Sequence, residues 1–441
     1  MSSVLFKLII IVILFTTTAM SWDVQLSTSH IHELQMGKSV EIHFNSTTYE
    51  NDSEESKIEI ISTDSEVIIT YPRFFDLPKK DHQSTWNAKF NITGQFLGYA
   101  KIYLQMVQFK NGNVVSITNS SNSHISVTVV REQRFIDKVF LICVVVLMSI
   151  IFINLGCAIE AKQIKECLQK PIAPISSFVS QFIILPIISY YYAKLIFPNQ
   201  VAMQLGLYFT GISPGGGASS VWSVLLGGNI NLSVVLTTIG TLESYIMIPF
   251  WATFLGSYIF AVEELPVPYS RIGSSILSLI IPLIVGVLIQ RFMPRVCKVM
   301  VRVLKPLSSF LILFIIIFAT VSNLYLFKIF SWQILLAGAL IPWTGYIIGF
   351  ITAYIAQLPV PDIISMTIES GIQNTGIAIF MLKFSLGQPA ADITTVVPVA
   401  VALMTPIPLT VAFIFKKCLQ KKKQEEIIDV ATVTMLNENK E

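Results

Sequence analysis

The sequence predicts a multi-pass α-helical membrane protein with an N-terminal β-sandwich domain, and three observations support this fold class. Charged residues make up 13% of the 441-residue chain, about half of the usual share in a soluble protein. Mean hydropathy is +0.67, and the chain becomes almost continuously apolar from residue 136 onwards. Before that point, short segments alternate polar and apolar residues, as half-buried strands do.

Residues 1–21 are typical of a secretory signal peptide. Lys7 closes a weakly basic start, an apolar run follows at Leu8–Phe15, and Ala19 and Ser21 are small residues suited to a cleavage site. The apolar run is shorter than the roughly 20 residues that a membrane-spanning helix requires. We therefore expect residues 1–21 to direct export of the segment that follows.

Residues 22–134 are predicted to form one β-sandwich domain of immunoglobulin-like size. Strand-like runs recur between clusters of Asn, Gly, Ser and Pro, at residues 39–44, 57–61, 66–71, 88–92, 99–109 and 125–130. Four Asn-x-Ser/Thr sequons, which accept N-linked glycans in exported domains, fall at Asn45, Asn51, Asn91 and Asn119. The domain is therefore expected to be glycosylated and extracytoplasmic.

Residues 135–417 are predicted to form a transmembrane domain with nine spans, because each apolar segment is long enough to cross a bilayer. The predicted spans are residues 136–157, 172–197, 201–225, 230–260, 270–291, 304–327, 332–357, 361–385 and 390–415. Basic residues follow the first, fifth and ninth spans, whereas Glu263 and Glu264 follow the fourth. Cytoplasmic loops are enriched in Lys and Arg, so residues 418–441 are expected to be a cytoplasmic tail and the N-terminus extracellular or lumenal.

Two of these spans are interrupted by polar and glycine-rich segments. Residues 211–220 in the third span contain Pro214 and three consecutive glycines, and residues 369–375 in the eighth read Glu-Ser-Gly-Ile-Gln-Asn-Thr. Backbone groups freed by such breaks are tolerated in a membrane only where they are buried in protein or line a wet cavity. Paired breaks in two halves of a chain are typical of transporter sites built on inverted repeats.

Glu369 is the most informative single residue. A charged side chain at the bilayer centre costs about 3 kcal/mol or more, and no Lys or Arg occurs between Asp362 and Lys383. Carboxylate, amide and hydroxyl oxygens, together with freed carbonyls, suit a hard cation such as Na⁺. The alternative is a structural carboxylate paired with a base on another helix.

Two other function classes find little support. Residues 211–215 match the G-x-S-x-G pattern of serine hydrolases, but Pro214 has no N–H for an oxyanion hole, and no histidine follows His124 to act as a base. We therefore do not expect an enzyme. The net charge of +3, without a long basic stretch interleaved with aromatic residues, argues against nucleic-acid binding.

Three motifs resemble the signatures of the sodium/bile acid cotransporter family. They are Glu369-x-Gly371-x-Gln373-Asn374, Pro214-Gly215-Gly216-x-Ala218-Ser219 and Gly228-Asn229-x-x-Leu232-Ser233-x-x-x-Thr237. The resemblance covers residues 136 to about 415, and the N-terminal domain behind a signal peptide is similar to the orphan P3-like branch of that family. It implies a core domain and a panel domain, with the third and eighth spans broken and crossing near the midplane.

The resemblance also implies two sodium sites and a turn that faces substrate. The first sodium site would use Ser219, Ser220, Ser233, Thr237 and Glu369. The second would use Gln181, Gln373, the Glu369 carboxylate and the carbonyls of Ser370 and Ile372. The substrate would face Pro214, Gly215, Gly216, Gly217 and Asn374. The chain departs from the family at Ser220, where Asn is usual, and at Glu243, where the fourth span is usually uncharged.

These observations together predict sodium-coupled symport of an organic anion, of bile-acid or steroid-conjugate type. Na⁺ is expected as the coupling ion, the lipid bilayer as the surroundings, and no other cofactor is implied. The alternative is a non-transporting receptor or adhesion protein on a transporter-derived scaffold. The change at Ser220 favours that alternative, and the intact motif at residues 369–374 opposes it.

Overall fold

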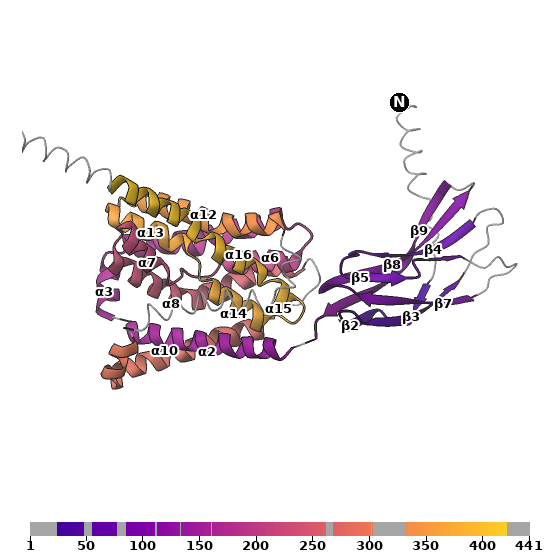
Figure 1. Cartoon of the computed structure of the whole chain (residues 1–441), viewed down its shortest axis with the longest axis horizontal. Helices are drawn as coiled ribbons and strands as arrows, with labels where there is room; N and C mark the ends of the chain where they lie inside the picture. Colours follow the sequence, from indigo (N-terminus) through magenta and orange to yellow (C-terminus); the bar gives the residue numbers. More distant parts are fainter. Residues whose placement is uncertain are drawn as a thin grey trace, which may run out of the picture. The chain divides into compact units, whose positions relative to one another are not determined.

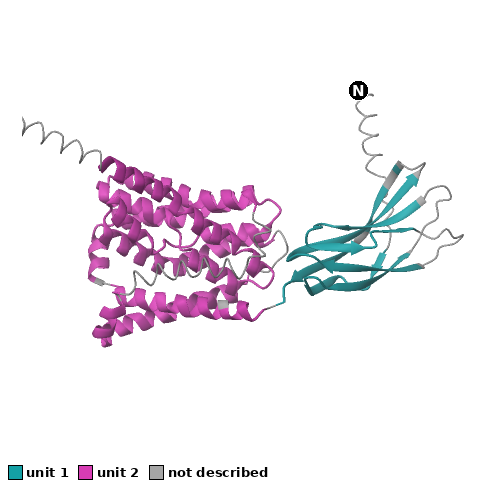
Figure 2. Cartoon of the chain, in the orientation of Figure 1, with its two compact units in different colours: residues 1–132 teal, residues 133–441 magenta. Residues whose placement is uncertain are grey.

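The structure is a computed structural model that describes residues 24–47, 55–76, 85–110, 113–132, 134–159, 161–261, 268–300, 302 and 331–420. The chain divides into two compact units, Met1–Glu132 and Gln133–Glu441 (Figure 2). Four sequence predictions fall wholly or almost wholly outside the described residues. They are the signal peptide at 1–21, the sequon at Asn51, the span at 304–327 and the tail at 418–441.

The described residues of unit 1 form two β-sheets (Figure 1). The first has the strand order β1 (Val24–Leu26), β3 (Ser39–Thr47), β7 (Thr85–Gly94), β5 (Ile68–Tyr71). The second has the order β2 (His30–Gln35), β9 (Asn113–Val130), β8 (Gly98–Lys110), β4 (Glu55–Ser62), β6 (Phe74–Asp76). All pairs are antiparallel except β2 with β9. The predicted β-rich N-terminal domain is confirmed, and the short strands β1, β2 and β6 are additional to the six expected.

Alternating apolar side chains from both sheets form one buried core. Ile58 and Ile60 on β4 belong to the same buried cluster as Phe90 and Ile92 on β7. These side chains occupy every second position, which places them on one face of each strand. The two sheets therefore pack face to face as a β-sandwich.

Three sequon asparagines lie on described strands, and all three are exposed. Asn45 belongs to β3, Asn91 to β7 and Asn119 to β9. Asn45 pairs with Asn87 and Asn91 with Glu41 across the β3–β7 ladder, so both sequons lie on the outer face of the four-stranded sheet. The asparagines are accessible to glycosylation, which itself stays a prediction.

Unit 2 is a bundle of helices (Figure 1), and within the residues that the structure describes six of them are long and apolar enough to cross a membrane. These are α2 (Phe135–Ala158), Ile172–Ile196, α8 (Ile230–Phe254), α10 (Tyr269–Phe292), α12 (Trp332–Ile355) and Ala390–Gln420. Ile172–Ile196 comprises α4 (Ile172–Phe178), η1 (Val179–Ile184) and α5 (Leu185–Ile196), and Ala390–Gln420 begins with α15 (Ala390–Ile393) and α16 (Val396–Met404). Shorter helices are α3 (Ala161–Gln169), α6 (Val201–Gly211), α7 (Ser219–Leu226), α9 (Gly256–Phe260), α13 (Val360–Gly371) and α14 (Thr375–Ser385).

Unit 2 is thus the membrane-spanning part of a multi-pass protein. The third predicted span is divided into α6 and α7, and the eighth into α13 and α14. The fourth predicted span ends earlier than expected, at Phe254, and the short helix α9 follows it. The count of nine spans stays a prediction.

The helices α2 and α10 lie side by side because glycines allow their backbones to meet. A Cβ atom added at Gly156 would lie 2.9 Å from the Cα of Gly286, and one added at Gly286 would lie 2.9 Å from the Cα of Gly156. Small residues at a crossing permit this close approach in membrane helices. The two helices therefore form a tightly packed pair.

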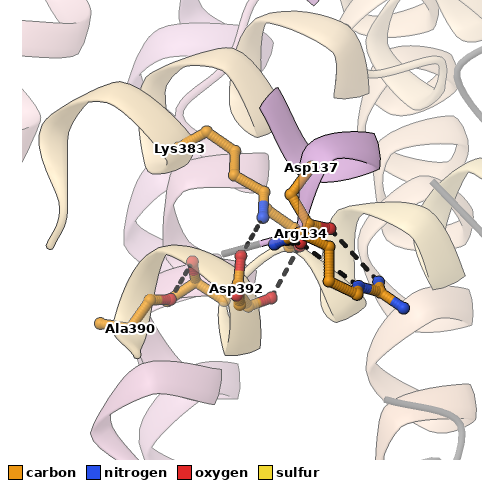
Figure 3. Close-up of polar contacts among 7 residues, drawn as sticks. Arg134, Asp137, Lys383, Ala390 and Asp392 are labelled. Atoms are coloured by element: carbon orange, nitrogen blue, oxygen red, sulfur yellow. Dashed lines mark hydrogen bonds and ion pairs between the residues drawn. The ribbon is translucent and has the colours of Figure 1, made fainter. Parts of the chain in front are cut away.

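Charged residues gather where α2 begins and α14 ends (Figure 3). The Lys383 ammonium forms an ion pair with the Asp392 carboxylate, and their side chains are only 10% and 3% exposed. Figure 3 draws Arg134 and Asp137 in the same group of polar contacts, and the Arg134 guanidinium lies 3.3 Å from the Asp137 carboxylate. This buried ion pair therefore links the end of α14 to α15, and each charge neutralises the other.

Candidate functional site

The two broken spans cross and bond to each other through their freed backbone groups. The Gly216 N–H donates to the Ile372 carbonyl at 2.7 Å, and the Asn374 N–H donates to the Pro214 carbonyl at 2.8 Å. Between these bonds, Gly215 and Gln373 form an antiparallel β-bridge. In lipid an unsatisfied backbone group costs several kcal/mol, so this pairing is what makes both breaks tolerable.

Glycine is required at the crossing because side chains from other helices fill the space. A Cβ atom at Gly215 would collide with the Glu369 carboxylate, and one at Gly371 would collide with the ring of Tyr346. The Tyr346 ring is fixed in turn, since its hydroxyl donates to the Thr405 carbonyl at 2.9 Å. The glycines therefore bring the two broken spans and Glu369 into direct contact.

Two half-helices begin at the crossing. α7 starts at Ser219 and α14 at Thr375, each directly after a break. The Asn374 side chain caps α14 by accepting the Ile377 N–H at 3.1 Å. Helix N-termini carry partial positive charge, so both half-helices present an environment that favours anionic groups, an arrangement that broken helices also provide in known transporters.

The structure brings together all five residues predicted for the first sodium site. The Thr237 hydroxyl lies 2.8 Å and 2.9 Å from the two carboxylate oxygens of Glu369, and 3.2 Å from the Ser219 hydroxyl. The Ser233 hydroxyl lies 3.5 Å from the hydroxyls of both Ser219 and Ser220. We call these five residues the first oxygen group. It is assembled from α7, α8 and α13.

The chemistry of the first oxygen group fits a hard cation. Glu369 is 3% exposed, and none of the ion pairs found within the described ranges involves it. Hydroxyl groups are its bonded neighbours, so its negative charge is hydrogen-bonded but not neutralised. Buried charges are normally paired or coordinate a metal ion, and a cluster of carboxylate and hydroxyl oxygens is suited to Na⁺.

Gln181, Gln373 and Ser370, predicted for the second site, form a chain of hydrogen bonds. The Gln181 side-chain NH₂ donates at 2.7 Å to the side-chain oxygen of Gln373 and at 2.7 Å to the Ser213 carbonyl. The Gln373 NH₂ donates to the Ser370 carbonyl at 2.9 Å. The Ile372 carbonyl accepts the Gly216 N–H, which leaves one lone pair for a further ligand.

One buried oxygen of this second group lacks a partner. The side-chain oxygen of Gln181 has no hydrogen-bond donor in the part of the chain that the structure describes, although Gln181 is 4% exposed. Buried polar atoms are nearly always satisfied. A cation between this oxygen and the neighbouring carbonyls would satisfy it, so these residues fit the predicted ion.

A π-helical turn positions Gln181 and also reveals a residue that the sequence analysis missed. η1 holds both Ser180 and Gln181 in buried positions, and the Ser180 hydroxyl lies 2.8 Å from that of Ser370. π-helical turns are rare and often occur at functional sites. Two adjacent polar residues in a mostly apolar span were the available signal, because a regular helix would turn them about 100° apart.

The residues predicted to face substrate differ in exposure. Gly217 is exposed and Asn374 is half-buried, whereas Pro214, Gly215 and Gly216 are buried against the second break. The latter three hold the crossing together through the contacts described above. Only the edge formed by Gly217 and Asn374 is accessible among these five residues.

Comparisons with known proteins agree with this arrangement. The family model described as Sodium Bile acid symporter family matches residues 145–330. The mouse P3 protein is 29% identical over 363 residues, covering 78% of this chain and 74% of the relative. The human P3 protein is 32% identical over 260 residues, or 58% of this chain and 54% of the relative. The uncharacterized sodium-dependent transporter YocS of Bacillus subtilis is 33% identical over 242 residues, or 53% of this chain and 71% of the relative.

Proposed function

The chain belongs to the sodium bile acid symporter family, in a branch similar to the P3 proteins, and from this premise we propose that it couples Na⁺ entry to the transport of an organic anion. The observation that carries the proposal is the Glu369 carboxylate, which is buried at the crossing among hydroxyl groups. Its charge is the feature that a coupling cation would neutralise.

We assign one Na⁺ to the first oxygen group and one to the group around Gln181. In the first, Glu369 supplies charge, and Ser219, Ser220, Ser233 and Thr237 supply hydroxyl oxygens. In the second, Gln181 supplies an amide oxygen that has no other partner in the described part of the chain, and Gln373, Ser370, Ile372 and the shared Glu369 carboxylate complete the set.

The proposed substrate is an amphipathic anion of bile-acid or steroid-conjugate type. The family's own description names bile acids, and the N-termini of α7 and α14 would attract an anionic group at the edge formed by Gly217 and Asn374. Two Na⁺ with one monovalent anion would carry one net positive charge inward. That movement gains about 2.3 kcal/mol per 100 mV of membrane potential.

The proposed topology places the N-terminal unit outside the cytoplasm and the C-terminal tail inside. Basic residues near the ends of α2 and α10 support it, because Lys162 and Lys165 follow α2 and Arg291 lies in the last turn of α10. The exposed sequons of unit 1 agree with export by the N-terminal signal peptide that the sequence predicts.

A second candidate function is a non-transporting receptor or adhesion protein that retains the transporter scaffold. Ser220 favours it, because its hydroxyl lies at the edge of the first oxygen group, 3.5 Å from Ser233, and offers a shorter reach than the Asn that the family usually has. Weaker sodium binding would follow from the loss of one amide oxygen. The contacts of Thr237 with Glu369 at 2.8 Å and with Ser219 at 3.2 Å are intact, which favours retained transport.

Uptake of a panel of labelled organic anions into cells that express the chain distinguishes the two functions. Transport predicts uptake in Na⁺ medium that is lost when choline replaces Na⁺. The receptor function predicts no uptake of any anion in either medium, although the protein reaches the same membrane. Mock-transfected cells supply the baseline, and surface biotinylation reports the amount of protein at the plasma membrane.

A further inference from the structure

A second set of contacts joins the start of α8 to α13, the first half of the eighth span, away from the crossing. Asn229 caps the start of α8: its side-chain oxygen accepts the Leu232 N–H at 3.2 Å. The NH₂ of the same side chain donates at 2.8 Å to a carboxylate oxygen of Asp362, in the first turn of α13. One amide side chain therefore begins α8 and binds α13 at the same time.

The backbone around Asn229 strengthens this junction. The Asn229 N–H donates to the Pro361 carbonyl at 3.0 Å, and the Ser365 hydroxyl donates to the Asn229 carbonyl at 2.9 Å. A Cβ atom at Gly228 would lie 2.6 Å from the Ser365 hydroxyl oxygen, so glycine permits the close approach. Both polar atoms of the side chain and both backbone polar groups are thus engaged.

The two helices are cross-linked at matching intervals. Thr237 follows Asn229 by eight residues on α8, and Glu369 follows Asp362 by seven residues on α13. At about 1.5 Å per residue these intervals are about 12 Å and 10.5 Å, close to two helical turns in each helix. The Asn229–Asp362 and Thr237–Glu369 hydrogen bonds therefore link the facing sides of α8 and α13 at two levels, about two turns apart, and the two helices run in the same direction. We call the Asn229–Asp362 hydrogen bond the first rung between these helices.

We infer that Asn229 and Asp362 are positioning residues for the first oxygen group. Their bond fixes the register of α13 against α8, and a slip of one residue, about 1.5 Å, would separate Glu369 from the Thr237 hydroxyl. Neither residue touches the proposed ion. This inference rests on the proposed function, because the Asn229–Asp362 hydrogen bond is inferred to hold the proposed sodium ligands together.

The test measures thermal unfolding of the full-length protein in detergent against Na⁺ concentration, with choline keeping the ionic strength constant. Asp362→Leu removes the acceptor, so the Na⁺ concentration for half-maximal stabilisation should rise about tenfold, the equivalent of 1.4 kcal/mol. Asn229→Asp should have a similar effect because it places two carboxylates together. Asp362→Asn should resemble the wild type, since its amide oxygen still accepts the Asn229 NH₂.

The exchange of both residues is the decisive variant. In Asn229→Asp/Asp362→Asn, the aspartate at 229 can still cap Leu232, and the new amide at 362 can donate to its second oxygen. The wild-type Na⁺ curve should return. If the exchange does not restore it, or if Asp362→Leu lowers Tm without moving the Na⁺ curve, the rung is only structural and the inference is overturned. A wild type that shows no Na⁺ response overturns the proposed function and this inference together.

Discussion

Among single residues, Glu369 is the buried carboxylate that no ion pair of the described residues neutralises. A carboxylate that is 3% exposed loses nearly all hydration, and desolvation of an unpaired charge costs several kcal/mol. The Thr237 hydroxyl offsets part of that penalty through a contact of 2.8 Å. A bound cation would offset much more, so the protein should be more stable with its ion than without it.

Glu369→Gln should abolish stabilisation by Na⁺ while leaving the sodium-free protein folded. The amide keeps the size of the side chain and can still contact Thr237, but the charge that attracts the cation is removed. Sodium-free Tm should be equal or higher, because a buried charge no longer has to be desolvated. Thermal unfolding with and without Na⁺ measures both effects.

Glu243→Gln is the matched control for that experiment. Glu243 is a half-buried carboxylate on α8, six residues beyond Thr237 and about 120° around the helix from it. Its replacement should leave the Na⁺ curve in place and should alter the pH dependence of transport more than its Na⁺ dependence. If both variants lose the Na⁺ response equally, the effect is not specific to the crossing.

Ser220→Asn should lower the Na⁺ concentration for half-maximal stabilisation, by roughly threefold to tenfold, which corresponds to about 1 kcal/mol. Asn adds an amide oxygen that reaches further than the hydroxyl now 3.5 Å from Ser233. Ser220→Ala should move the curve in the opposite direction because it removes an oxygen. A Na⁺ curve that is identical in all three proteins would show that residue 220 does not limit ion binding.

At the scale of secondary-structure elements, the breaks depend on glycines whose roles differ. Gly371 faces a ring that is held in place by the Tyr346–Thr405 hydrogen bond, whereas a Cβ at Gly217 would meet nothing within 4 Å. The two positions lie in opposite breaks of one crossing and make a matched pair for measuring the effect of packing.

Gly371→Ala should destabilise the protein by about 1–3 kcal/mol, because the added methyl overpacks the space beside Tyr346. Gly217→Ala should leave stability close to that of the wild type. Tm of the two variants, measured in the same detergent without Na⁺, makes the comparison. If Gly371→Ala keeps the Tm of the wild type, the crossing tolerates a methyl group beside Tyr346 and its packing is looser than described.

The buried ion pair of Lys383 with Asp392 predicts that loss of one charge destabilises the protein more than loss of both charges. Asp392→Asn leaves an ammonium buried without its counter-charge, and removal of one partner from a buried pair typically costs about 3–5 kcal/mol. Lys383→Met/Asp392→Leu removes both charges and should be much less destabilising. The free energy of unfolding of the three proteins, or their Tm if unfolding is irreversible, tests this expectation. It is contradicted if the double variant is the least stable of the three.

For the whole molecule, the central expectation is that unit 1 is exported and glycosylated. Glycosidase treatment should lower the apparent mass of the mature protein, and Gln at Asn45, Asn51, Asn91 and Asn119 should abolish that change. Asn87→Gln is the control, since Asn87 is exposed on β7 opposite Asn45 but lies outside any sequon. An untreated mass equal to the treated one would contradict the proposed topology.

The sequence by itself determined where the chain changes from a β-rich segment to a membrane-spanning one, and which types of residue its candidate site contains. Hydropathy and alternation separated a β-rich segment from a membrane-spanning one, because apolar periodicity follows directly from what each face contacts. A carboxylate within an apolar span and two glycine-rich breaks identified the unusual positions, since neither is tolerated in lipid without a partner. Family motifs then grouped the hydroxyl and amide residues by resemblance.

Only the tertiary structure decided how those residues meet. Local periodicity does not encode which backbone groups pair across a crossing, so the bonds from Gly216 to Ile372 and from Asn374 to Pro214 could not be read from the sequence. The contact of Ser180 with Ser370 and the Asn229–Asp362 hydrogen bond likewise join segments that are distant in the sequence. Long-range packing fixes these features, because each satisfies a polar group that its own helix leaves free.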